Sequence, residues 1–88
     1  MLNLTMYTTD GCHLCEYAET VLEDVVLTEP ELTWKKVDIA SQDDLIERYG
    51  IRIPVIRLEG ADYDVGWPFS ADDVLHYLAQ FKTLAHPT

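Results

Sequence analysis

The run Cys12-His13-Leu14-Cys15 constrains this 88-residue chain more than any other feature. It holds the only two cysteines, and it lies between a strand-like segment and an amphipathic helix pattern. Two thiols at this spacing in the first turn of a helix can form a disulfide without backbone movement, and the free N–H groups of that turn favour a thiolate on the first of them. The run therefore predicts either a thiol–disulfide exchange site or part of a metal site.

Hydrophobic periodicity predicts a strand before the cysteines and a helix after them. Residues 2–7 alternate between apolar and polar side chains, which indicates a short strand. The apolar residues that follow the run recur at three- and four-residue spacing, namely Leu14, Ala18, Val21, Leu22, Val25 and Val26. This spacing indicates a helix that ends near residues 27–28, because Pro30 prevents its continuation.

The second half of the chain predicts a strand over 32–39, a short helix that Gly50 ends, a hairpin over 54–65 and a final helix. Ser41 and Ser70 each precede an acidic residue by three positions, which is the pattern of a helix N-cap. The final helix is expected to bury Val74, Leu75, Tyr77, Leu78 and Phe81. The order β-α-β-α-β-β-α predicts an α/β fold with a mixed four-stranded sheet and helices on both faces.

The charge balance argues against several classes of partner. The chain has 16 acidic and 6 basic residues, a formal net charge of −10, and its basic residues are scattered. Nucleic acids and anionic membranes require clustered Lys and Arg, so we expect neither as a partner. No apolar run approaches the roughly 20 residues of a spanning helix, and the first residues lack the basic segment of a signal peptide. We expect a cytoplasmic monomer, in which a structural disulfide is disfavoured.

Three short segments follow one another in the sequence: Gly11-Cys12-His13-Leu14-Cys15, Tyr49-Gly50-Ile51-Arg52-Ile53-Pro54-Val55 and Gly66-Trp67-Pro68-Phe69. Together with the element order they resemble the thioredoxin superfamily, and in particular small bacterial glutaredoxin-like proteins without an assigned substrate. The resemblance covers roughly residues 2–81. It implies one thioredoxin-like domain over residues 1–88, with a tail at 82–88.

The resemblance implies a thiol–disulfide oxidoreductase whose catalytic residues are Cys12 and Cys15. Cys12 is expected to attack a substrate disulfide, and Cys15 to resolve the mixed disulfide. A cis bond between Ile53 and Pro54 is also implied, which would let the Ile53 backbone bind an extended substrate by strand addition. Trp67 is expected either to form an apolar wall for the substrate or to pack against the last helix.

His13 is the remaining candidate for substrate binding. If protonated, its imidazole would favour the Cys12 thiolate; alternatively, it points into solvent. Asp10 would act in the opposite direction, because a carboxylate disfavours a second negative charge nearby. The sequence leaves the net effect on Cys12 open.

Glutathione is an open question as a ligand. Glutathione-binding relatives usually carry a basic residue near the cysteines and a Gly-Gly turn before the last helix, and this chain has neither. Arg52 is the best candidate to bind the glutathione carboxylates, and Ser70 with Asp72 or Asp73 could bind its amino group. We expect no dedicated cofactor, a disulfide-containing protein or small thiol as substrate, and a reductant such as a thioredoxin reductase or glutathione.

Other function classes remain as alternatives. A zinc site could draw on Cys12, His13 and Cys15 with His76 or His86, although the paired spacing of a zinc ribbon is missing. Cys12 could instead share an iron–sulfur cluster between two chains. A third alternative is a thioredoxin-fold binding or adapter module whose thiols carry out no chemistry.

Overall fold

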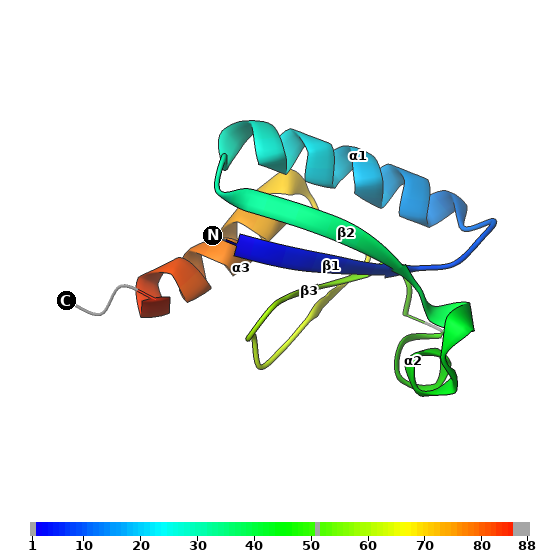
Figure 1. The fold of residues 1–88 in the computed structure, drawn as a ribbon. Helices are drawn as coiled ribbons and strands as arrows, with labels where there is room; N and C mark the ends of the chain where they lie inside the picture. The colour runs from blue at the N-terminus through cyan, green and yellow to red at the C-terminus, as the bar shows by residue number, and fades with distance from the viewer. Residues whose placement is uncertain (1, 51, 86–88) are drawn as a thin grey trace.

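The computed structural model describes residues 2–50 and 52–85; Met1, Ile51 and the last three residues, which include His86, lie outside the described residues. The elements are β1 (Leu2–Thr8), α1 (His13–Thr28), β2 (Leu32–Asp38), the 3-10 turn η1 (Ile39–Ser41), α2 (Asp43–Tyr49), β3 (Val55–Leu58), β4 (Val65–Gly66) and α3 (Ala71–Ala85), as Figure 1 shows. This order confirms the predicted succession of strands and helices.

The four strands form one mixed sheet in the order β2-β1-β3-β4. β1 runs parallel to β2, with Leu4 opposite Trp34, and antiparallel to β3, with Leu4 opposite Leu58. β3 and β4 form the antiparallel hairpin. The parallel pair requires a crossover, which α1 provides, and the carboxyl end of central β1 therefore leads directly into the cysteine run.

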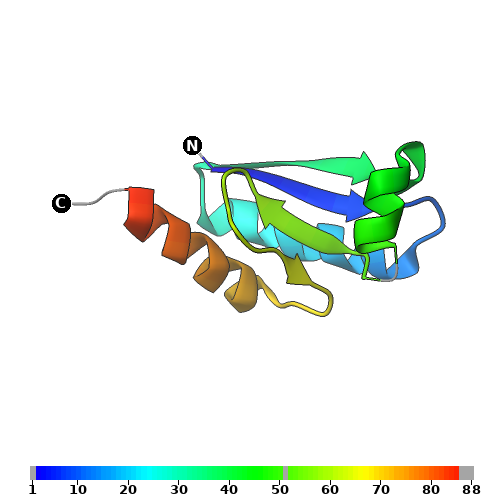
Figure 2. The ribbon, with the colours of Figure 1, turned by 90° about the horizontal axis from the view of Figure 1, so that it is seen from below.

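Helices lie on both faces of the sheet, as predicted, but they cover the two faces unequally. On one face Leu4 and Met6 of β1 are buried in a cluster with residues of α1 and α3. On the other face Tyr7 stacks on Tyr49 of α2, with ring centroids 4.2 Å apart. Figure 2 shows α2 across one end of the sheet, where β1 and β2 finish and β3 begins, and Tyr49 packs with Val55 of β3 there. The rest of that second face has no helix over it among residues 2–50 and 52–85.

Two predictions about local hydrogen bonding are wrong. Ser41 does not cap α2; it lies in η1, where its hydroxyl donates to the Asp38 carbonyl (2.8 Å), and Gln42 takes the N-cap position without a side-chain bond. The second hairpin strand is only Val65–Gly66, and the backbone carbonyls of Ala61 and Tyr63 before it accept hydrogen bonds from the side chains of Arg57 and Tyr77 instead. The other predicted cap is confirmed: the Ser70 hydroxyl accepts from the Asp73 N–H at 3.1 Å.

A prediction about one residue of α1 is also wrong, whereas the predicted end of α2 is confirmed. Leu14 is 48% exposed, and Cys15 lies on the buried face of α1 instead. Gly50 ends α2 as expected, but in a right-handed conformation (φ −50°) rather than the left-handed one of a glycine cap. A Cβ at Gly50 would collide with the Ile46 carbonyl oxygen. Glycine is therefore needed here for close approach rather than for positive φ.

Tyr77 of α3 binds the hairpin through its hydroxyl group, and replacing this residue tests the contribution of that group to stability. Its hydroxyl accepts from the Leu58 N–H (3.0 Å) and donates to the Tyr63 carbonyl (2.7 Å), while burial raises its pKa. Tyr77→Phe should lower the free energy of unfolding by about 1–3 kcal/mol, because the Leu58 N–H loses its buried partner. Urea unfolding measures this, with Tyr17→Phe at an exposed site as control. Equal stability of the two variants would contradict the assigned role.

Candidate redox site

Cys12 and Cys15 form a disulfide at the start of α1, with their Cα atoms 5.2 Å apart. This separation lies within the usual range for bridged cysteines. Gly11, at φ +78°, allows the tight turn that brings the chain from β1 to Cys12. Cys12 is the N-cap residue, and its sulfur accepts a hydrogen bond from the Cys15 N–H at 3.1 Å. The free N–H end of the helix therefore points at Cys12 Sγ.

The two sulfurs differ in their access to solvent. Cys15 is 2% exposed and belongs to the main hydrophobic cluster, whereas Cys12 is partly buried at the edge of that cluster. Of the pair, Cys12 is thus the one that an incoming molecule can reach. The fold gives the two cysteines the unequal positions that an attacking and a resolving thiol require.

A groove of about 400 Å³ runs beside Cys12, and the charged residues in its lining are mainly acidic. The side chains of Asp10, Glu16, Glu19 and Asp38 contribute negative charge from the β1–α1 loop, α1 and the end of β2. His13 also lines the groove, with its ring 88% exposed and its Nδ1 atom 3.2 Å from a Glu16 carboxylate oxygen. His13 is therefore engaged with Glu16 at the solvent edge.

The structure brings Ile53 and Trp67 to the same cluster as the cysteines. The Ile53–Pro54 peptide bond is cis, as predicted, and Pro54 is buried. The Trp67 side chain packs against the main cluster next to Phe69, and the Trp67 backbone N–H donates to the Pro54 carbonyl (2.9 Å). The Ile53 N–H donates to the Tyr49 carbonyl at 3.1 Å. This N–H is therefore occupied, and only the carbonyl of Ile53 remains for the expected strand addition.

Three of the four side chains expected to hold glutathione are engaged within the protein. Arg52 forms an ion pair with Asp64 (2.5 Å), and this hydrogen bond raises the pKa of the Arg52 guanidinium. Ser70 and Asp73 form a reciprocal cap at α3, since the Asp73 carboxylate also accepts from the Ser70 N–H at 2.9 Å. Of the four candidates, Asp72 has no such partner among the described residues.

The part of the chain that the structure describes contains neither a metal-binding cluster nor a helix that could span a membrane. Within residues 2–50 and 52–85, no three His, Cys, Asp or Glu side chains gather as a group that could hold a metal ion. Neither α1 nor any other described helix combines the length and apolar character needed to cross a bilayer.

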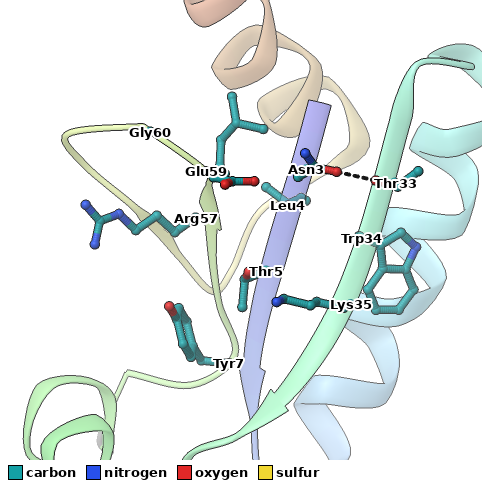
Figure 3. A pocket seen from close by; sticks show the side chains of 11 residues that line it. Asn3, Leu4, Thr5, Tyr7, Thr33, Trp34, Lys35, Arg57, Glu59 and Gly60 are labelled. Atoms are coloured by element: carbon teal, nitrogen blue, oxygen red, sulfur yellow. Dashed lines mark hydrogen bonds between the residues drawn. The ribbon is translucent and has the colours of Figure 1, made fainter. Parts of the chain in front are cut away.

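A second hollow, of about 670 Å³, lies on the face of the sheet that α2 leaves open (Figure 3). Side chains of three strands line it, among them Tyr7, Lys35 and Arg57. Within it, the Thr33 hydroxyl donates to the Asn3 side chain at 2.8 Å. This hollow contains neither cysteine, so the candidate site remains the groove at Cys12.

Comparison with known proteins gives one family and several related folds. The family described as Glutaredoxin-like domain (DUF836) matches residues 3–79. The solution structure of target protein XcR50 from X. campestris is 31% identical, covers 88% of this chain and 92% of its own, and superposes with a TM-score of 0.73. No curated protein matches the chain.

More distant structures share the fold. Protein Ne2328 from Nitrosomonas europaea is 23% identical with a TM-score of 0.75, covering 86% of this chain and 89% of its own. The reduced form of desulfothioredoxin from Desulfovibrio vulgaris Hildenborough is 14% identical with a TM-score of 0.71. The match covers 90% of this chain and 80% of desulfothioredoxin. These likenesses establish a thioredoxin-like α/β fold for the chain.

Proposed function

Since this chain belongs to the glutaredoxin-like domain family, we propose that it is a thiol–disulfide oxidoreductase that reduces disulfides through Cys12 and Cys15. Family membership and the cysteine pair together support a redox-type function. The observation that carries the finer proposal is the unequal access of the two sulfurs at one helix N-terminus. The accessible Cys12 is suited to attack, and the buried Cys15 to resolve.

The reaction begins from the dithiol form. The Cys12 thiolate attacks one sulfur of the substrate disulfide; the substrate S–S bond breaks, and the first substrate thiolate leaves. Cys15 then loses its proton and attacks Cys12 Sγ, which forms the intrachain disulfide and releases the second substrate thiolate. The substrate gains two electrons and the Cys12–Cys15 pair loses two. A reductant, such as a thioredoxin reductase or glutathione, returns the pair to the dithiol.

An apolar surface beside Cys12 supports a polypeptide substrate. Leu14 and Tyr17 are 48% and 63% exposed on the first turns of α1. Trp67 and Ile53 are partly buried against the cluster that Cys12 borders. Exposed apolar side chains that gather in one patch mark surfaces that bind other molecules. We infer that these residues contact the chain on either side of a substrate disulfide.

A redox titration combined with a turnover assay tests the proposed function. In dithiothreitol buffers, the Cys12–Cys15 pair should titrate as one reversible two-electron couple, with a tenfold change in the oxidised-to-reduced ratio for about every 30 mV. With dithiothreitol as reductant, the protein should also accelerate the reduction of insulin or 2-hydroxyethyl disulfide.

The same measurements separate the alternatives. A pair that titrates but accelerates neither substrate would contradict the oxidoreductase and favour a binding module. Stoichiometric zinc, or a visible-absorbing cluster in the protein as purified, would instead favour metal binding through Cys12.

A further inference from the structure

We propose that the groove at Cys12 selects disulfides that carry positive charge next to the sulfur atoms, such as a polypeptide cystine flanked by Lys or Arg. Anionic disulfides, oxidised glutathione among them, would be disfavoured by the same groove. The inference rests on the proposed function, because it names the substrate class of that site. It goes beyond that function by deriving selectivity from residues outside the cysteine pair.

The charge of the groove is strongly negative next to the reactive sulfur. Its lining has four carboxylates and, within the described part of the chain, one lysine, Lys36. The Lys36 amine lies 3.3 Å from a Glu19 carboxylate oxygen, so its charge is already paired. Glu16 directly follows Cys15 in sequence, Asp10 lies two positions before Cys12, and both are exposed. Because the same ion pair also neutralises Glu19, a cation on the substrate would face the carboxylates of Asp10, Glu16 and Asp38 as its disulfide reaches Cys12.

The helix that carries the sulfurs separates this acidic groove from the apolar surface. Glu16 and Glu19 lie on the flank of α1 that faces β2, as the Glu19–Lys36 ion pair shows. Leu14 and Tyr17 occupy the opposite flank, about half a turn away around the helix axis. A bound polypeptide would therefore meet apolar side chains on one side of Cys12 and carboxylates on the other.

Nearby groups that could compensate an anionic substrate are committed elsewhere. The Arg52 guanidinium is held by Asp64, and the Ser70 N–H already donates to the Asp73 carboxylate, which is itself anionic. A glutathione carboxylate would have to break the Arg52–Asp64 pair before it gained a partner. A site lined by charge of one sign changes association rates by roughly 10–10³-fold, and salt weakens the effect. The structure thus favours cationic over anionic disulfides.

Three small disulfides that differ in charge test the proposal: cystamine, neutral 2-hydroxyethyl disulfide and anionic 3,3′-dithiodipropionate. For each disulfide, the rate at which it oxidises the dithiol protein is divided by the rate at which it oxidises dithiothreitol. This ratio corrects for the intrinsic reactivity of the disulfide. At low salt we expect cystamine to exceed dithiodipropionate by about tenfold. The ratio should fall towards one at 1 M salt, where charges are screened within about 3 Å.

A matched pair of variants distinguishes the effect of charge at the groove from the effect of the protein's net charge. Asp10→Asn with Glu16→Gln removes two charges at the groove, and Glu23→Gln with Asp24→Asn removes two from exposed positions further along α1. The first variant should lower the cystamine preference at least about threefold, within the range of such field effects. The second should leave it unchanged.

The outcomes distinguish this inference from the function on which it rests. If none of the three disulfides oxidises the protein, the proposed function fails and the inference fails with it. If the neutral disulfide reacts but cystamine has no advantage, the selectivity alone is refuted. Equal loss of preference in both variants would also refute it, because the effect would then belong to the net charge and not to the groove.

Discussion

Replacing Cys12 by serine will reduce the turnover of disulfide substrates to the rate of the reductant alone. The attacking group in thiol–disulfide exchange is a thiolate, and a serine hydroxyl does not ionise near neutral pH. Cys15 cannot take over, because it is 2% exposed within the hydrophobic cluster. Reduction of insulin or 2-hydroxyethyl disulfide by dithiothreitol measures the loss. Undiminished activity in the variant would refute Cys12 as the nucleophile.

The stability of the same variant provides the control. Cys12 is the N-cap residue of α1, and its sulfur accepts a hydrogen bond from the Cys15 N–H. Serine is among the preferred N-cap residues, so the Cys12→Ser protein should unfold at nearly the same urea concentration as the reduced wild type. Cys12→Ala should be less stable by about 1 kcal/mol, because the cap is lost. If Cys12→Ser loses activity but keeps its fold, the loss comes from the missing thiol and not from unfolding.

The features predicted correctly from the sequence are those that neighbouring residues determine. The strand, turn and helix around the cysteines follow from periodicity and from Gly11. The cap at α3 forms because the side chains of Ser70 and Asp73 each bond to the backbone N–H of the other residue. Ser41 carries the same signal at α2, but the Asp38 carbonyl competes successfully for its hydroxyl. A local pattern fails where the fold supplies a nearer partner.

The parts of the site that the sequence did not reveal depend on contacts between distant segments. The ion pair of Arg52 with Asp64 and the bond from the Ile53 N–H to Tyr49 require folded loops. The acidic groove had a usable signal, since Asp38 ends a strand parallel to β1 and such carboxyl ends meet at one edge. Combining that rule with Asp10 would have placed both carboxylates beside the cysteines.

Replacing Cys15 will stop the reaction halfway and trap the substrate on Cys12. The first exchange step uses Cys12 alone, so Cys15→Ser should still react with 2-hydroxyethyl disulfide, and one adduct per chain should accumulate. The second step needs a thiol within reach of Cys12 Sγ, and the chain has no third cysteine. Intact-mass spectrometry after removal of all free thiol measures the adduct. In the wild type, the same treatment should leave the intrachain disulfide and no adduct.

A second variant addresses the buried position of Cys15. A serine hydroxyl at a site only 2% exposed needs a hydrogen-bond partner, whereas Cys15→Ala keeps the site apolar. Both variants should trap the adduct, and added dithiothreitol should release it. If the adduct disappears without external thiol as fast as in the wild type, then Cys15 does not resolve the intermediate. A stable adduct in both variants would assign the resolving step to the Cys15 thiol. Serine and alanine differ in polarity, and the two variants have only the loss of this thiol in common.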